Sequence, residues 1–214
     1  MDQPRALGFS WGRVTGLVVV TAAVVATHNL TLSRYDLDWA YVVGGIGLGL
    51  AILVGWIPAG RGRDALPWIV AAVIVGLVVW VVDPTDARLA GNSAGTVLGG
   101  LLVTLFGVAV LEEVLFRHWL LVGWSWIAPL PPGRPGPQAV GAGVSSLAFG
   151  LWHVAAELGR LGSDATPVEL VPGILATTLA GLGLAWLRLR SRGVLAPILV
   201  HASFNTAVAL AVWR

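Results

Sequence analysis

Apolar residues run along this chain in seven long blocks, which short polar segments separate. The blocks cover residues 14–32, 39–57, 66–82, 95–111, 139–156, 170–187 and 194–213. Each block approaches the roughly 20 residues that a helix needs to cross the hydrocarbon core of a bilayer. Helices are the expected form, because unpaired backbone amides are not tolerated in lipid. The pattern therefore predicts an all-α, polytopic transmembrane bundle of about seven spans, or eight.

The composition supports a membrane protein and excludes several other classes. Hydrophobic residues make up 57% of the chain and charged residues 11%, less than half the share of about 25% that is usual in a soluble domain. Every basic residue is an arginine, and the arginines are scattered, so no basic stripe exists that nucleic acid could follow. The absence of cysteine excludes disulfides, thiolate zinc sites and cysteine nucleophiles.

The placement of the arginines predicts the orientation in the membrane. With a cytoplasmic N-terminus, eight arginines fall inside (5, 13, 61, 63, 134, 188, 190 and 192) and four outside (34, 88, 160 and 214). This asymmetry follows the positive-inside rule. Exclusive use of arginine, together with abundant Ala, Val and Gly, is typical of a GC-rich bacterial source. We therefore expect an integral protein of a bacterial cell membrane. Separately, the prolines in residues 129–137 predict a loop there.

Three polar clusters interrupt the apolar blocks. They are Glu112-Glu113 with Arg117, Phe149 with His153, and His201 with Asn205. A charged side chain at mid-membrane costs roughly 2.5–3.5 kcal/mol on insertion scales, and such residues usually mark function. The other two histidines, His28 and His118, fit no such cluster and are interpreted as interfacial residues.

Helical geometry assigns the residues of the first cluster different roles. Glu113 and Arg117 are four residues apart, so they share a helix face and can form an ion pair. Glu112 is rotated by about 100° from its neighbour and points to a different surface. We interpret Glu113–Arg117 as a structural clamp and Glu112 as the free carboxylate. The alternative is an interfacial ion pair with no site nearby.

His201 and Asn205 also share a helix face and can direct N–H donors toward one point, as an oxyanion site does. The alternative is ordinary hydrogen bonding between helices. Glu157, four residues after His153, could orient the imidazole of that histidine or be solvated. A carboxylate near a histidine can hold and deprotonate a water molecule. Together the clusters contain the parts of a peptidase that attacks with water, and the chain has no H-E-x-x-H motif.

These three motifs, in this order on three hydrophobic segments, resemble the CPBP family, also called the ABI family. That family comprises CAAX proteases, including Ras-converting-type endopeptidases, and bacteriocin-processing enzymes. The resemblance implies an intramembrane glutamate-dependent endopeptidase without a cofactor, in which Glu112 and His153 activate water and His201 and Asn205 form the oxyanion site. It also implies that Glu113, Arg117 and Phe149 support the site. On this basis residues 95–214 form the catalytic membrane core, and residues 1–94 are N-terminal spans of unassigned role.

A site among the fourth, fifth and seventh spans requires Glu112 and His153 to lie at similar depth. We therefore expect the fourth helix to continue through residues 119–127 and the fifth to run from about Gly143 toward Gly162, which places both residues in mid-helix.

Three other functions fit the same residues. A zinc metallopeptidase would use Glu112, His153 and His201 as metal ligands. A proton-coupled transporter would use intramembrane Glu and His as a relay. A non-catalytic immunity or scaffold protein would retain the motifs without needing Glu112. The expected partners are the lipid bilayer and a membrane-associated peptide or protein substrate, with no nucleic acid; the oligomeric state is left open.

Overall fold

The computed structural model describes residues 38–53, 55, 57–82, 108–127, 136–162 and 164–212, together with the helical positions 12, 15–16, 18–19, 21–23 and 25–26. Every extended element in these ranges is a helix, and they contain no strand. The predicted all-α fold is thus confirmed for the described part of the chain. The chain divides into two compact units, Met1–Tyr35 with Leu115–Trp186, and Asp36–Val114 with Leu187–Arg214.

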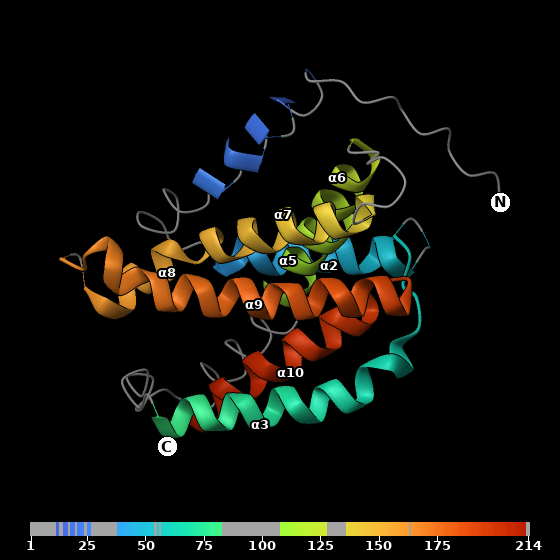
Figure 1. The fold of residues 1–214 in the computed structure, drawn as a ribbon. Coiled ribbons are helices and arrows are strands. Elements are labelled where there is room, and N and C mark those ends of the chain that lie inside the picture. Colours follow the sequence, from blue (N-terminus) through green and yellow to red (C-terminus); the bar gives the residue numbers. More distant parts are fainter. Residues whose placement is uncertain are drawn as a thin grey trace. The chain divides into compact units, whose positions relative to one another are not determined.

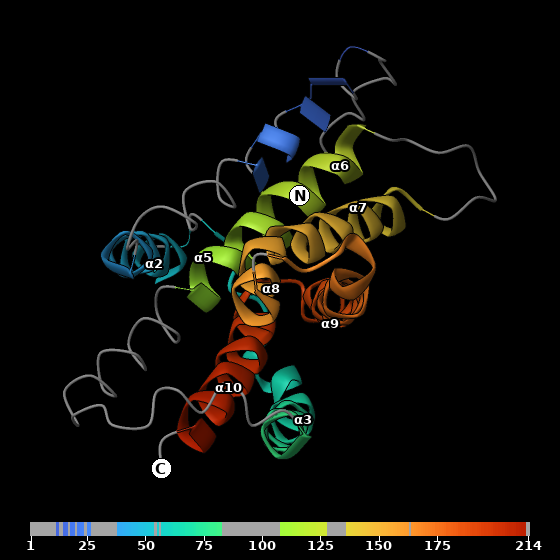
Figure 2. The same ribbon diagram turned by 90° about the vertical axis from the view of Figure 1, so that its left-hand side faces the viewer.

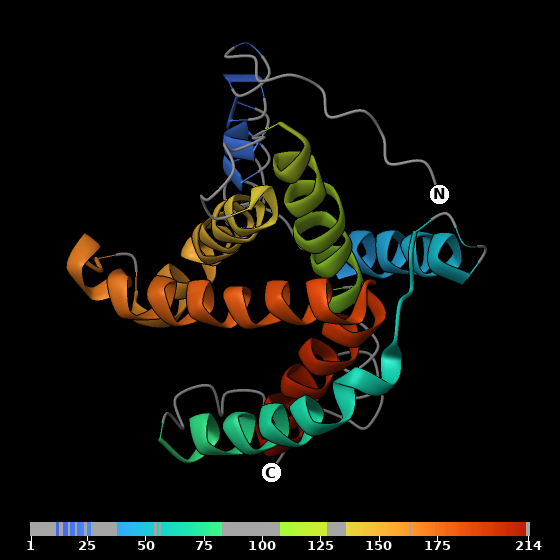
Figure 3. The same cartoon turned by 45° about the vertical axis from the view of Figure 1, so that its right-hand side comes forward.

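The unit formed by Asp36–Val114 and Leu187–Arg214 is organised around its last helix, α10 (Leu195–Val212). This helix packs along α3 (Leu66–Val82) and also contacts the single turn α5 (Ala109–Glu113) (Figures 1 and 3). The helix α2 (Asp38–Leu53) packs against α5. Buried side chains from several of these segments form one apolar cluster, consisting of Ile57, Val110, Val114, Val194 and Ile198. Apolar packing therefore fixes α5 against the start of α10.

A backbone tie joins the segment before α3 to the segment before α10. Arg61 N donates to the carbonyl of Ser191 (2.9 Å), and Leu195 N donates to the carbonyl of Ala59 (3.0 Å). The approach depends on Gly60 and Gly193, because a Cβ on either would collide with the backbone of the other segment. Gly60 also has φ +73°, a conformation that favours glycine. We call these contacts between residues 58–61 and 191–195 the glycine tie.

The other unit contains the longest helix of the described residues, α9 (Pro167–Ser191), most of which belongs to this unit. The π-helical segment η4 (Val114–Leu120) leads into α6 (Leu121–Ile127), which packs on α7 (Pro137–Trp152) (Figure 2). A second apolar cluster lies here, made of Phe116, Leu120, Ala148, Phe149 and Trp152. The short helix α8 (Val154–Leu161) follows α7 directly.

Local sequence explains where α7 and α9 begin. Pro137 occupies the first turn of α7, where a missing N–H is harmless because no helical acceptor exists for it. At the start of α9, Glu169 accepts hydrogen bonds from both the backbone N–H and the hydroxyl of Thr166 (2.7 Å each). This pairing of Thr with a Glu three residues later is a capping-box arrangement. It begins α9 three residues before the apolar block that starts at Leu170.

The predicted apolar blocks agree with several observed helices. The block 66–82 coincides with α3, while 39–57, 170–187 and 194–213 correspond to α2, α9 and α10 with shifted ends. Two described helical stretches are long and apolar enough to cross a membrane: Gln138–Leu161, which covers α7 and α8 together, and Pro167–Ser191. The blocks 14–32 and 95–111 and the loop 129–137 fall largely outside the described residues. The predicted number of spans thus remains a prediction.

Candidate active site

Two glutamates at the end of α5 meet a histidine on α10 within one unit. His201 Nδ1 donates to Glu113 Oε1 at 2.9 Å, and His201 Nε2 lies 3.9 Å from Glu112 Oε2. The imidazole is therefore flanked by carboxylates at both of its nitrogen atoms. Because α5 packs on α10, residues 88 positions apart in the sequence come into hydrogen-bonding contact.

All three side chains of this group are buried, with exposed fractions of 3% for Glu112, 0% for Glu113 and 8% for His201. Burial of a carboxylate is unfavourable unless hydrogen bonds or an opposite charge compensate. The imidazole compensates Glu113 directly and lies beside Glu112. A buried carboxylate–imidazole group of this kind can hold and transfer a proton.

Asn205 lies on α10 one turn after His201 and is half-buried. Residues four positions apart on an α-helix lie on the same face, so the Asn205 amide and the His201 imidazole share one side of α10. The α-helical geometry on which their predicted pairing depends is thus confirmed. Their joint action on a substrate oxygen stays a prediction.

Phe149 is the centre of the polar and aromatic contacts in the other unit. The guanidinium carbon of Arg117 lies 4.7 Å from the centroid of the Phe149 ring, a cation–π distance. The ring of Phe116 meets Phe149 edge-to-face at 5.2 Å. The imidazole of His153 also packs edge-on against the Phe149 ring, with centroids 4.7 Å apart. Phe149 therefore contacts both Arg117 and His153, and its supporting role stays a prediction.

His153 occupies the break between α7 and α8, with φ −90° and ψ 5°. Its backbone N–H donates to the carbonyl of Gly150 (3.1 Å), and its ring Nδ1 donates to the carbonyl of Phe149 (2.8 Å). The side chain thus caps a carbonyl near the end of α7, where helices leave acceptors unsatisfied. The Nδ1–H of His153 is thus committed to the Phe149 carbonyl.

The carboxylate of Glu157, which the sequence suggested as a partner for the His153 imidazole, binds Arg160. Its Oε2 accepts from Nε (3.0 Å) and Nη2 (2.9 Å) of Arg160, while the imidazole uses the Phe149 carbonyl. The physical reason is that the ring points back along α7, whereas Glu157 lies one turn forward on α8.

The predicted site residues therefore fall into two groups. Glu112, Glu113, His201 and Asn205 belong to one unit, and Arg117, Phe149 and His153 belong to the other. The predicted pairings of Glu113 with Arg117 and of Glu112 with His153 each involve one residue of each unit and stay predictions. The bond between Glu113 and His201 is a contact that the sequence interpretation missed, because no local spacing signals a pair 88 residues apart.

Comparison with known proteins identifies one family. The family model described as type II CAAX prenyl endopeptidase Rce1-like matches residues 94–207, which is just over half of the chain. The matched stretch contains the three polar motifs from Glu112 to Asn205. No curated protein and no solved structure matches the chain significantly.

Proposed function

The chain belongs to the type II CAAX prenyl endopeptidase Rce1-like family, a membrane-embedded family of proteases, and from this premise we propose that it is an intramembrane endopeptidase. Its proposed substrates are membrane-associated peptides or proteins, and its proposed location is a bacterial cell membrane with the N-terminus in the cytoplasm. The observation that carries the proposal is the His201 imidazole held at one nitrogen by Glu113 and approached at the other by Glu112.

The first proposed step is the activation of water by Glu112 and His153. Glu112 accepts a proton from the water, and the resulting hydroxide attacks the carbonyl carbon of the scissile peptide bond. The Nε2 lone pair of His153 accepts a hydrogen bond from the same water, since its Nδ1 proton is committed to the Phe149 carbonyl. The proton then passes from Glu112 to the leaving nitrogen as the carbon–nitrogen bond breaks.

The second proposed element is an oxyanion site formed by His201 and Asn205. Donation from His201 Nε2 to the developing oxyanion requires a proton on that nitrogen as well as on Nδ1. Glu113, which accepts the hydrogen bond from His201 Nδ1, balances the positive charge of such an imidazole. Asn205 adds a neutral amide donor one turn further along α10. Glu113 thus takes part in the proposed chemistry through His201 as well as through its predicted clamp with Arg117.

No metal enters this proposal, because Glu112 supplies the base and His201 with Asn205 supply the donors that stabilise negative charge. A zinc-dependent enzyme with the same residues makes a different forecast. Chelator treatment of the purified protein, followed by metal analysis and an activity assay, distinguishes the two. Activity that disappears with the metal and returns with added zinc would contradict the metal-free mechanism.

The proposal is tested by comparing membranes from cells that produce the full chain or its Glu112→Gln variant. Mass spectrometry of new peptide termini is expected to reveal cleavage products with the unmodified chain only. With a purified peptide substrate identified in this way, Glu112→Gln should lower kcat by about 10²–10⁴-fold, the usual contribution of a general base. Asn205→Ala should lower kcat by about 10²–10³-fold, as for one oxyanion donor.

A change in kcat with little change in KM is expected for Asn205→Ala, because the contact is made mainly in the transition state. Turnover must be measured per folded molecule, with thermal stability followed in parallel. Absence of any product that depends on Glu112, or full turnover in Glu112→Gln, would contradict the proposed function.

A further inference from the structure

The helix α9 contacts the chain on both sides of His153. Three residues before His153, Gly150 on α7 lies against α9, and four residues after it, Glu157 on α8 lies against α9 as well. The break at His153 is thus bracketed by two contacts with one helix. All of these residues belong to the same compact unit.

The contact before the break involves no side chain on α7. A Cβ on Gly150 would collide with Thr178 Oγ1 and lie 2.8 Å from the carbonyl oxygen of Ile174. The Thr178 hydroxyl is itself directed at that carbonyl, to which it donates at 2.7 Å. Backbone and a fixed hydroxyl therefore determine how closely the end of α7 approaches α9.

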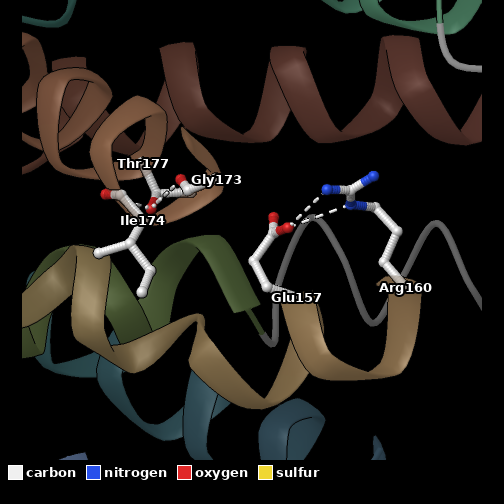
Figure 4. A network of polar contacts seen from close by, with 5 residues as sticks. All are labelled: Glu157, Arg160, Gly173, Ile174 and Thr177. Atoms are coloured by element: carbon white, nitrogen blue, oxygen red, sulfur yellow. Dashed lines mark hydrogen bonds and ion pairs between the residues drawn. The ribbon is translucent and has the colours of Figure 1, made fainter. Parts of the chain in front are cut away.

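The contact after the break is made by a carboxylate. A Cβ on Gly173 would lie 2.6 Å from Glu157 Oε1 and closer still to the carboxyl carbon, so Glu157 occupies the space that a side chain at position 173 would fill. Arg160 holds the other oxygen through Nε and Nη2. Figure 4 shows the Glu157 carboxylate between the guanidinium of Arg160 and the turn of α9 that carries Gly173 and Thr177. We call this arrangement of Glu157, Arg160 and Gly173 the α8–α9 contact.

A backbone hydrogen bond connects the α8–α9 contact to His153. The N–H of Glu157 donates to the carbonyl of His153 (3.0 Å), so the first turn of α8 starts at the histidine. A displacement of Glu157 pulls on the His153 carbonyl through this bond and turns the backbone of His153. The φ angle of His153 sets where its Cβ lies relative to α7, so this turn carries the ring with it. The imidazole then no longer meets the Phe149 carbonyl in the same geometry.

We propose that Glu157 is a positioning residue. It sets the direction of the His153 imidazole through its packing contact with Gly173 and its ion pair with Arg160. The consequence for catalysis rests on the proposed endopeptidase function, whereas the effect on the orientation of His153 does not. Glu157 acts on the water-activating step only through His153.

The test uses the full chain in detergent, with Glu157→Ala, Gly173→Ala, the double variant and the conservative Glu157→Gln. Gly173→Ala pushes the Glu157 carboxylate away from α9. The change should leave the fold intact, since the displaced group is the end of a flexible side chain. The control is Glu169→Ala, which removes an exposed carboxylate at the start of α9 that bonds only locally, to Thr166, in the contacts described above. Nitrogen NMR of histidine-labelled protein reports which ring nitrogen of His153 carries the proton, with the signals assigned through a His153 variant.

We expect Nδ1 of His153 to carry the proton in the unmodified chain, in Glu157→Gln and in Glu169→Ala. Glu157→Ala and Gly173→Ala should both give a mixture of the two tautomers. Their kcat should fall by up to about 10²-fold with unchanged KM, the loss that a misplaced catalytic group produces. The double variant should be no worse than either single variant, because both remove the same contact.

Wild-type His153 signals in folded Glu157→Ala and Gly173→Ala would overturn the proposal. The proposal would also be overturned if Gly173→Ala alone were impaired while Glu157→Ala and the double variant both kept full turnover. In that case the methyl group added by Gly173→Ala would act only by colliding with the Glu157 side chain. If the chain cleaves no peptide, the NMR result still decides the positioning role, and the two proposals fail separately.

Discussion

At the scale of single residues, two adjacent glutamates reach opposite sides of one imidazole. Glu113 bonds His201 Nδ1, while Glu112 lies near Nε2, the nitrogen proposed to face the substrate. The rotation of about 100° between neighbouring helical residues makes this possible. The same rotation supported the prediction that the two glutamates have different roles. It did not reveal that His201 is the group they share, since that contact depends on how α5 packs against α10.

The bond between Glu113 and His201 leads to a prediction for stability. Glu113→Ala leaves the buried Nδ1–H of His201 without this acceptor, and we expect a loss of about 1–3 kcal/mol in the free energy of unfolding. Glu113→Gln keeps an oxygen acceptor at the same position and should lose less. Thermal unfolding in detergent measures both changes, and turnover per folded molecule should fall in the same order. An unchanged Tm in Glu113→Ala would show that His201 does not depend on this bond.

At the scale of helices, hydropathy predicted regular segments well and predicted their interruptions poorly. The block 66–82 matches α3 because that helix is apolar along its whole length, and α9 begins early because Thr166 and Glu169 cap it. The fourth helix continues through residues 119–127 as expected. The π-helical segment from Val114 to Leu120 was not expected, and its wider i→i+5 turns weaken the four-residue spacing argument applied to Arg117.

The break at His153 is the other interruption that the sequence did not reveal. We expected His153 within a continuous helix starting near Gly143, whereas α7 begins at Pro137 and ends at Trp152. No proline or positive φ angle marks the break. It accompanies contacts of Gly150 and Glu157 with α9, which are distant in the sequence and therefore invisible to any local pattern.

The glycine tie gives a prediction at the scale of elements. Gly193→Ala places a methyl group into the backbone of Ala59 and Gly60, where no side-chain rotation can relieve the collision. We expect a loss of about 1–3 kcal/mol in stability, as for other overpacked sites. Gly183→Ala on α9 is the matched control, because a Cβ there meets nothing within 4 Å. Equal Tm values for the two variants would contradict a structural role of the tie.

At the scale of the whole molecule, the predicted topology can be tested by cysteine labelling. The chain contains no cysteine, so each introduced cysteine is the single reactive thiol. Single cysteines at the exposed positions Arg63, Asp164 and Arg190 can each be labelled with a membrane-impermeant maleimide in intact cells and in opened vesicles. The charge asymmetry predicts that Asp164 reacts from outside and that Arg63 and Arg190 react only from the cytoplasmic side. Labelling of Asp164 and Arg190 from the same side would mean that α9 does not cross the membrane.

The glycine tie also shows that the stretch matched by the family model and the residues that hold α10 in place do not have the same boundaries. The stretch matched by the family model begins at residue 94, yet α10 is anchored to residues 58–61 and packs along α3, all of which precede that stretch. A chain shortened to the matched residues would keep every polar motif and lose the partner of the helix that carries His201. Residues 58–61 and α3 thus support the helix that carries His201, and we expect a chain cut at residue 94 to lose that support.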